Sequence, residues 1–333
     1  MTTTSTDGTR PLRLGVLGAA RIARNFIAGV TGSPTVTVTA VASRDPARAA
    51  QFAADAQLPQ VFESYEALLA SPDIDAIYLP LPNGLHGLWS TRACAAGKHV
   101  LCEKPLASSA AEARAMYAAA RAAGVTLVEA YPYRAQEQTL RLKSLVAAGA
   151  IGRLRTIHAA FGFPLRDRAD IRLDPSLAGG ALMDLGSYPL SLIRYLTGAP
   201  PQSLHAVGTM DPAGVDDSAL VSLTFADGVL AQAACSFSTV VHRQALIVGD
   251  EGVIETTYAN HTTEVPPVLR LRRGSDRRAA VEVISVAPAN GFRAEAESFA
   301  AYVRGEAWSG ITEAESIDVA MMLDAARAQV AGA

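Results

Sequence analysis

The first 130 residues alternate short apolar runs with segments of helical periodicity, and this alternation leaves few possible folds. The apolar runs predict strands at residues 12–18, 36–42, 74–80, 98–102 and 125–129. The segments between them predict helices at residues 20–30, 46–56, 64–70, 86–96 and 108–123. Strands separated by helices of this length form βαβ units, in which helices cover both faces of a parallel sheet. The sequence therefore predicts an α/β domain with a doubly wound, Rossmann-type sheet.

The pattern changes after residue 129. A helix at residues 136–148 precedes several strand-like segments, and Asp227-Gly228 between two of them predicts a tight hairpin. Two helices, near residues 293–304 and 312–329, end the chain. We therefore predict a polar, disordered tail at residues 1–10, a Rossmann-type α/β domain at 11–129 and an α+β domain with an antiparallel sheet at 130–333.

The composition excludes several classes of protein. Lys and Arg number 29 and Asp and Glu 32, a net charge of −3, and the chain lacks the basic block that nucleic acid or an anionic membrane would require. No apolar run reaches the ~20 residues of a membrane span, and the N-terminus lacks the basic and apolar regions of a signal peptide. The three cysteines are too few and too widely spaced for a disulfide framework or a zinc site. We expect a cytoplasmic protein without a metal.

The turn between the first predicted strand and helix has the composition of a dinucleotide site. The fingerprint G-x-G-x-x-G/A reads here Gly18-Ala19-Ala20-Arg21-Ile22-Ala23. Gly18 permits the tight turn, and a small residue at position 20 lets the backbone approach a pyrophosphate held by the helix N-terminus. Ala20 stands where glycine is usual, so an ordinary strand–helix turn in an Ala-rich chain is the alternative. We expect residues 18–22 to bind the cofactor.

The end of the second predicted strand indicates which dinucleotide binds. NAD-binding folds usually place an acidic residue there to hold the ribose 2′-hydroxyl. This chain has Ser43 and Arg44, whose hydroxyl and guanidinium suit a 2′-phosphate. In the alternative, Arg44 is only a surface residue and Asp45 takes the acidic role. We favour NADP as the cofactor, with NAD as the second choice.

A lysine after the fourth long strand is the first candidate catalytic residue. Lys104 follows the strand predicted at residues 98–102, and ligands of open α/β sheets bind beyond the carboxyl ends of strands. Pro105 restricts the backbone before it and is compatible with a cis peptide bond. An ammonium at this place would stabilise charge that develops on a substrate oxygen. In the alternative, Glu103 and Lys104 are solvated loop charges.

A carboxylate and a phenol form a second candidate group. Asp184 and Tyr188 are four residues apart in a stretch predicted as helix and would share one face. Gly186 between them costs roughly 1 kcal/mol relative to Ala, which close approach of a ligand or another backbone would explain. Pro189 removes a helical hydrogen bond, so the helix kinks there or begins later. In the alternative, Tyr188 is a core residue with a solvated hydroxyl and Asp184 a helix-start carboxylate.

These elements occur in the order and spacing of a known family. From about Leu12 onward the chain resembles the glucose–fructose oxidoreductase/inositol dehydrogenase (Gfo/Idh/MocA) family. The resemblance rests on the first turn, on YLPLPNGLH at residues 78–86, on AGKHVLCEKPL at 96–106 and on residues 179–188. Many members have His at the position of Tyr188. With tyrosine at this position, the chain resembles the subgroup that contains NADP-dependent sugar 3-ketoreductases, dimeric dihydrodiol dehydrogenases and some xylose dehydrogenases.

The resemblance implies a C-terminal substrate domain whose large, mostly antiparallel open sheet often forms the oligomer interface. A homodimer or homotetramer is therefore expected. The resemblance also implies that Lys104 is the active-site lysine, and that Leu81, Asn83 and His86 line the nicotinamide side of the crevice. A lone histidine is otherwise more often structural. We place Glu103 of the Glu-Lys-Pro element beside the cofactor as well.

The resulting hypothesis is an oxidoreductase. NADP exchanges a hydride with a carbonyl or alcohol carbon of a sugar-like substrate, Tyr188 moves the proton, and Lys104 makes that proton easier to lose. Asp184 binds a substrate hydroxyl or orients Lys104. Arg134 and Arg172 bind substrate oxygens, unless they are interface or surface arginines. The alternatives are a trans-dihydrodiol or aldose (xylose) 1-dehydrogenase and a non-catalytic, dinucleotide-sensing regulator.

Overall fold

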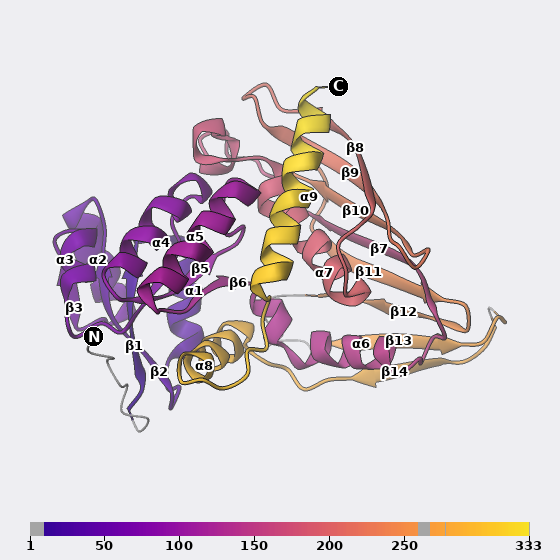
Figure 1. Ribbon diagram of the computed structural model, residues 1–333, viewed down its shortest axis with the longest axis horizontal. Helices are drawn as coiled ribbons and strands as arrows, with labels where there is room; N and C mark the ends of the chain where they lie inside the picture. The colour runs from indigo at the N-terminus through magenta and orange to yellow at the C-terminus, as the bar shows by residue number, and fades with distance from the viewer. Residues whose placement is uncertain (1–9, 259–266, 277, 333) are drawn as a thin grey trace.

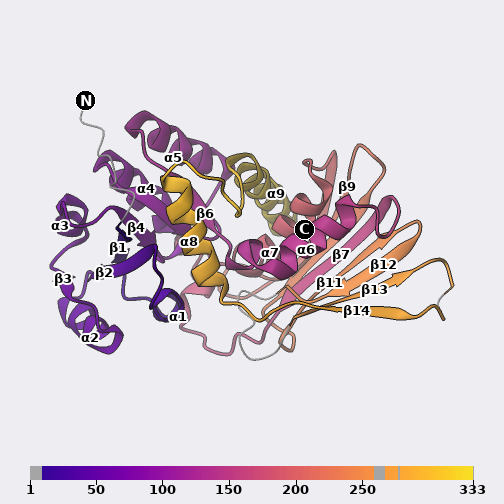
Figure 2. The same ribbon diagram turned by 90° about the horizontal axis from the view of Figure 1, so that it is seen from below.

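The computed structural model describes residues 10–258, 267–276 and 278–332. Two sheets lie side by side, one in the N-terminal part and one in the C-terminal part (Figure 1). Helices cover both faces of the first sheet and one face of the second (Figure 2). Among the described residues, no helix has the length and apolar character that crossing a membrane requires.

The first sheet is parallel throughout, with strand order β3-β2-β1-β4-β5-β6. Its strands are β1 (Leu12–Leu17), β2 (Val36–Ala42), β3 (Gln60–Phe62), β4 (Ala76–Leu79), β5 (His99–Glu103) and β6 (Leu127–Ala130). Its helices are α1 (Arg21–Val30), α2 (Pro46–Ala56), α3 (Tyr65–Ala70), α4 (His86–Ala95) and α5 (Ala110–Ala123). Because helices cover both faces, β4 and β5 are buried almost completely and read as continuous apolar runs. The predicted doubly wound sheet is confirmed, and the structure adds the short strand β3.

The second sheet has eight strands in the order β14-β13-β12-β11-β7-β10-β9-β8. They are β7 (Leu154–Gly162), β8 (Ser203–Met210), β9 (Asp216–Thr224), β10 (Leu230–Ser236), β11 (His242–Gly249), β12 (Gly252–Thr256), β13 (Val268–Arg273) and β14 (Val281–Ser285). Neighbours are antiparallel except β7 and β10, which confirms the predicted mostly antiparallel sheet. The hairpin predicted at Asp227-Gly228 joins β9 to β10.

One face of the second sheet carries a hydrophobic core, and the other is open. The helices α6 (Glu137–Ala147), α7 (Ser187–Thr197) and α9 (Glu313–Ala331) lie on the covered face (Figure 2). Side chains alternate between the faces along each strand. In β9, Val221 and Leu223 are therefore buried in the core, whereas Leu220 is exposed on the open face.

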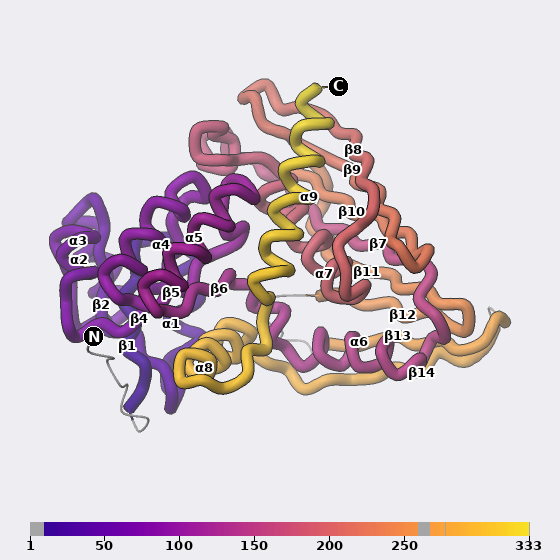
Figure 3. The backbone as a smooth tube through the Cα atoms, in the orientation of Figure 1, coloured from indigo at the N-terminus to yellow at the C-terminus, as the bar shows by residue number. Residues whose placement is uncertain are grey.

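The helix α8 (Gly291–Val303) joins the two parts of the molecule. Phe292 and Phe299 belong to the same core as Phe26 of α1, and α1 and α8 run side by side (Figure 3). Ala320 of α9 likewise packs into a core of the first domain. The C-terminal segment thus completes the packing of the Rossmann domain, and the domain boundary between residues 129 and 130 stays a prediction.

Candidate active site

A cavity of about 450 Å³ lies between the two domains, within the usual size range of small-molecule sites. It is at the carboxyl ends of β1, β4 and β5. The strand order reverses between β1 and β4, which is where ligands bind in open α/β sheets. The first domain lines the cavity with Ala20, Arg21, Ile22, Asn25, Pro80, Leu81, Pro82, Asn83, Glu103 and Lys104. The second domain contributes Phe161, Phe163, Ile171, Arg172, Leu177, Gly179, Asp184, Leu185 and Tyr188.

The turn before α1 has the geometry of an anion site. Gly18 has a φ of +110°, and a Cβ there would come within 2.8 Å of a Leu81 methyl carbon, so glycine is required. Ala20 is extended and precedes α1 without a side-chain cap, so no side chain occupies the first amides of the helix. The amide of Ala23 donates to the carbonyl of Ala20 at 3.2 Å, and the amides before it in the turn face no capping side chain. A helix N-terminus with available amides attracts phosphate. These residues fit the pyrophosphate of a dinucleotide.

Two guanidinium groups follow β2, one from the loop after the strand and one from the first turn of α2 (Pro46–Ala56). Arg44 is exposed next to the buried Ser43. Asp45, the alternative acidic residue, caps α2, and its carboxylate accepts a hydrogen bond from the amide of Arg48 at 3.1 Å. The Arg48 side chain donates in turn to the carbonyl of Ala19 at 3.0 Å. Arg48 thus lies between the strand end and the phosphate turn, a placement that the sequence reading missed.

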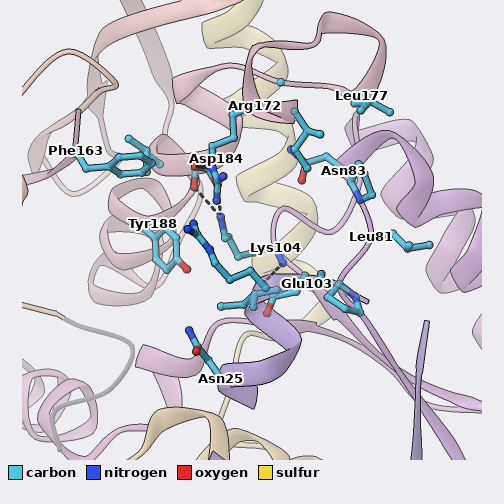
Figure 4. A pocket seen from close by; sticks show the side chains of 18 of the residues that line it. Asn25, Leu81, Asn83, Glu103, Lys104, Phe163, Arg172, Leu177, Asp184 and Tyr188 are labelled. Carbon is cyan, nitrogen blue, oxygen red and sulfur yellow. Dashed lines mark hydrogen bonds and ion pairs between the residues drawn. The ribbon is translucent and has the colours of Figure 1, made fainter. Parts of the chain in front are cut away.

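Lys104 is held by hydrogen bonds just beyond the end of β5. Its peptide bond to Pro105 is cis. Its Nζ donates to a carboxylate oxygen of Asp184 at 2.9 Å and to the carbonyl oxygen of Asp184 at 2.8 Å (Figure 4). The same carboxylate accepts from Nε of Arg172 at 2.6 Å. Asp184 therefore orients Lys104 and keeps two cations at one wall of the cavity.

These contacts determine the charges of the site. Burial alone would raise the pKa of Asp184, but Lys104 and Arg172 outweigh it and lower that pKa to about 2. Burial also opposes the ammonium of Lys104, yet the nearby Asp184 carboxylate raises the pKa of Lys104 above its ordinary value. Both groups are therefore charged at neutral pH. Lys104 is therefore a fixed positive charge at this wall of the cavity.

Tyr188 lies beside that positive charge. Nζ of Lys104 is 4.9 Å from the centroid of the Tyr188 ring. The rings of Tyr131 and Phe161 pack edge-on against it, each with its centroid 5.4 Å away. The residue is only 5% exposed but lines the cavity. The lysine and the phenol, taken from two distant stretches of sequence, thus meet at one site.

The backbone between Asp184 and Tyr188 departs from the predicted unbroken helix. Residues 182–186 form a π-helical turn that continues directly into α7 at Ser187, so Pro189 lies just after this irregular turn, where its missing amide is tolerated. The helix does not begin later; the interruption takes the form of a π turn before the proline. A Cβ on Gly186 would lie 3.2 Å from Sγ of Cys235 in β10, so a neighbouring strand explains this glycine.

Arg134 is a correction to the predicted site. It is 1% exposed, and its Nη2 donates to a carboxylate oxygen of Glu315 at 3.0 Å. Its guanidinium carbon lies 3.8 Å from the centroid of the Tyr195 ring. Arg134 does not line the cavity, because these residues of α7 and α9 bind it inside the second domain. The expected contact with substrate oxygens is wrong.

His86 is a second correction. It is fully buried, with one ring nitrogen 2.9 Å from the carbonyl oxygen of Pro105 and the other 2.7 Å from that of Leu81. It therefore connects the turns after β4 and β5 instead of lining the nicotinamide side. Leu81, Asn83 and Glu103 do line the cavity, and their contact with a cofactor stays a prediction.

Several lining residues were absent from the sequence prediction, namely Asn25, Phe161, Phe163, Ile171 and Leu177. For Asn25 a signal existed, because it lies one helical turn after Arg21 and shares its face. The others come from the end of β7 and from the loop before Gly179, whose approach to the first domain depends on tertiary structure. In that approach, Nδ2 of Asn83 donates to the carbonyl of Ala178 at 2.9 Å.

The matches to known families follow the same division of the chain. Residues 12–131 match the model of the oxidoreductase family with an NAD-binding Rossmann fold. Residues 139–255 match the model of the GFO/IDH/MocA C-terminal domain. The chain belongs to the Gfo/Idh/MocA family. The predicted family, fold class and enzyme class are confirmed.

Relatives within the Gfo/Idh/MocA family include enzymes named for sugar and diol substrates. The D-xylose 1-dehydrogenase (NADP(+)) 2 of Haloferax volcanii is 36% identical, over 94% of this chain and 96% of its own length. The trans-1,2-dihydrobenzene-1,2-diol dehydrogenase of Mus musculus is 36% identical, over 73% of this chain and 74% of its own. The 3-ketoreductase KijD10 of Actinomadura kijaniata, solved with NADP and TDP-benzene, superimposes with a TM-score of 0.87 at 30% identity, covering 96% of this chain and 98% of that one.

Proposed function

We propose that this chain is an NADP-dependent oxidoreductase that transfers a hydride between the nicotinamide and a carbonyl or alcohol carbon of a sugar or sugar-like substrate. The observation that carries the proposal is the group formed by Lys104, Asp184 and Tyr188 in a cavity that continues from the phosphate turn. A regulator that only senses a dinucleotide has no need of a proton donor held beside a fixed cation. The catalytic alternative is therefore favoured over the regulator.

The residues around the cavity fit the parts of NADP. The amides at the start of α1 receive the pyrophosphate, and Arg44 and Arg48 lie where they can receive the 2′-phosphate. The cofactor supplies the hydride chemistry. NADP is also named for the Haloferax relative and is bound in the KijD10 structure, which supports the same choice here.

The chain itself supplies the proton and its control. Tyr188 donates a proton to the substrate oxygen in reduction and accepts it in oxidation. A free phenol ionises near pH 10, so a neighbouring cation is needed to stabilise its anion at neutral pH. Lys104 is that cation. Asp184 keeps it charged and in place. Arg172 holds the same carboxylate and also faces the cavity, where it binds substrate oxygens.

The wall contributed by the second domain narrows the substrate class. Phe163, Ile171 and Leu177 present apolar surface, whereas Arg172 and Asn25 present hydrogen-bond donors. This mixture suits a sugar ring with an apolar substituent or deoxygenated carbons. The second candidate is an aldose (xylose) 1-dehydrogenase or trans-dihydrodiol dehydrogenase. It is favoured by the 36% identity to the Haloferax and mouse enzymes.

A ligand screen followed by turnover tests this function. The melting temperature is measured with NADP, NAD, D-xylose, a trans-dihydrodiol and a 3-keto-glucoside, because binding to the folded state alone raises it. NADPH absorbance is then followed with each substrate. We expect NADP to stabilise the protein more than NAD and at least one substrate to be turned over. A protein that NADP does not stabilise would contradict the cofactor assignment, and NADP binding without any turnover would favour the regulator.

We also propose that the chain forms a homodimer or homotetramer through the open face of the second sheet. The exposed apolar residues on that face are Val207, Leu220, Leu230, Val281 and Val283. An open sheet face with apolar side chains is typically covered by a partner. Light scattering coupled to size-exclusion chromatography should give a multiple of 34.8 kDa, and a monomer would contradict it. A cytoplasmic location stays a prediction from the sequence.

A further inference from the structure

Arg243 lies behind the proposed proton donor, on the covered face of the second sheet. It is in β11, and its register partner in β7 is Phe161, a residue that lines the cavity. Its guanidinium carbon is 4.0 Å from the centroid of the Tyr188 ring, closer than Nζ of Lys104 at 4.9 Å. Two cations from different domains therefore lie over the same phenol ring.

Three further rings hold the guanidinium in this place. Its carbon lies 4.8 Å from the centroid of Phe161, 4.8 Å from that of Tyr258 and 5.4 Å from that of Tyr133. A planar guanidinium stacks on aromatic faces in a way that a lysine ammonium cannot copy. The aromatic side chains thus fix both Arg243 and the ring of Tyr188, which fixes the direction of the hydroxyl.

A cation over the ring of a phenol favours its anionic form, because the phenolate spreads negative charge into the ring. This effect grows where water is excluded. Lys104 is tied to the Asp184 carboxylate by hydrogen bonds, so part of its field is neutralised. Arg243 acts on the same ring from another element of the fold.

We propose that Arg243 is a positioning residue for proton transfer, which orients the phenol of Tyr188 and stabilises its phenolate form. The kinetic consequences of this inference rest on the proposed function, whereas the effect on the phenol does not. No motif of the sequence indicates this role for Arg243, because only the pairing of β11 with β7 brings it to Tyr188.

The other titratable groups near the phenol come from several elements. The charged and ionisable side chains that interact with Tyr188 through ring contacts or through their charge are Lys104, Arg243, Tyr78, Tyr131, Tyr133 and Tyr258. Asp184 lines the same cavity. Burial raises the pKa of Tyr133 to about 12, and it also raises the pKa values of Tyr131 and Tyr258 well above the ordinary value of a tyrosine.

Nuclear magnetic resonance of the full-length protein tests the inference without a substrate. The nine tyrosines are labelled with carbon-13 at Cζ, and the Tyr188 signal is identified by its loss in Tyr188→Phe. We expect Arg243→Met and Arg243→Gln to move the Tyr188 titration midpoint upward by about one pH unit or more, and Arg243→Lys by less. Arg141→Met, at an exposed arginine of α6, is the matched control and should leave the midpoint unchanged. An unchanged midpoint in folded Arg243→Met overturns the inference.

A second measurement covers the case in which the neutral variants do not fold. In wild-type protein with labelled arginines, the Arg243 signal is identified by its loss in Arg243→Lys. The chemical shift of Arg243 should change with pH at the same midpoint as that of Tyr188, and it should not change with pH in Tyr188→Phe. A chemical shift of Arg243 that does not change when Tyr188 ionises overturns the inference.

Kinetics separate this inference from the proposed function. If the enzyme oxidises a sugar with NADP, Arg243→Met should move the pH profile of kcat to higher pH while KM for NADP changes less than about twofold. If folded Arg243→Met has a normal pH profile and an unchanged phenol titration, the proposed role of Arg243 is rejected and the proposed function is not affected. Absence of turnover in the wild type rejects the proposed function and leaves the titration result valid.

Discussion

The ammonium of Lys104 lies 4.9 Å from the centroid of the Tyr188 ring, and the two side chains belong to different domains. Lys104 follows β5 of the Rossmann sheet, and Tyr188 lies in the first turn of α7. The carboxylate of Asp184, one turn before Tyr188, receives a hydrogen bond from Lys104 at 2.9 Å. The proposed proton-transfer site is therefore complete only when the two domains pack against each other.

Removal of either member of this pair should abolish most of the turnover. Tyr188→Phe removes the proton donor, and Lys104→Met removes the positive charge beside it. General acid–base groups contribute roughly 10²–10⁴-fold, so kcat should fall by about 100-fold or more in each variant. Both should still bind NADP, as followed by thermal shift. Tyr302→Phe, on the surface of α8, is the matched control. Normal turnover in both variants would refute the mechanism.

Replacement of Arg44 by alanine should weaken NADP binding far more than NAD binding. A charge-assisted hydrogen bond to phosphate contributes about 1.5–3 kcal/mol, which corresponds to a loss of roughly 10–100-fold in affinity. Calorimetric titration of both cofactors measures this difference. Arg121→Ala, at an exposed arginine of α5, serves as the control. Equal losses for the two cofactors would show that Arg44 does not bind the 2′-phosphate.

Asp184→Asn should reduce both activity and stability. The substitution leaves the cations of Lys104 and Arg172 without their shared carboxylate, and breaking such a buried pair costs about 3 kcal/mol or more. Urea unfolding at neutral pH measures the loss. In the folded protein the pKa of Asp184 is lowered to about 2. The carboxylate therefore stabilises the fold fully at pH values above the ordinary pKa of an aspartate, and this stabilisation is lost as the pH falls toward 2. The variant and the wild type should therefore converge in stability in strong acid, and a constant gap down to that pH would contradict the ion pair.

Glu129→Gln should flatten the dependence of stability on pH in mildly acidic solution. Glu129 is 1% exposed, and burial raises its pKa to about 7. The folded state thus keeps a proton that the unfolded state releases near pH 4.5, so wild-type stability falls as the pH rises from about 4.5 to 7. The neighbouring Glu103 and Glu295, whose pKa values are also raised by burial, act in the same direction. Thermal unfolding between these pH values measures the slope. A slope as steep in the variant as in the wild type would exclude Glu129 as its source.

The sequence was sufficient for the elements whose pattern is local. The apolar runs of β4 and β5 identify buried parallel strands, and Gly18 is needed by a turn that its neighbours define. Lys104 could be placed at the cavity because the carboxyl end of a parallel strand determines where the next residue lies. The spacing of Asp184 and Tyr188 predicted only that they share one face, and the family resemblance suggested their roles. The intervening turn is π-helical and not α-helical.

Residues whose environment is made by distant segments could not be placed in this way. The local sequence around Arg134 is compatible with a substrate-binding arginine. Only its contacts with Glu315 and Tyr195 in the folded chain show that it is structural. His86 is likewise fixed by two carbonyl groups from separate turns. Arg243 was overlooked because β11 pairs with β7, a neighbour that no turn in the sequence indicates. In each case tertiary packing determines the role.

A crystal structure of the protein with NADP tests the central claim most directly. We predict that the pyrophosphate contacts the amides at the start of α1, that the 2′-phosphate lies at Arg44, and that the nicotinamide ring enters the cavity beside Lys104 and Tyr188. A nicotinamide that lies outside this cavity, or a cofactor bound away from the turn at Gly18, would contradict the account.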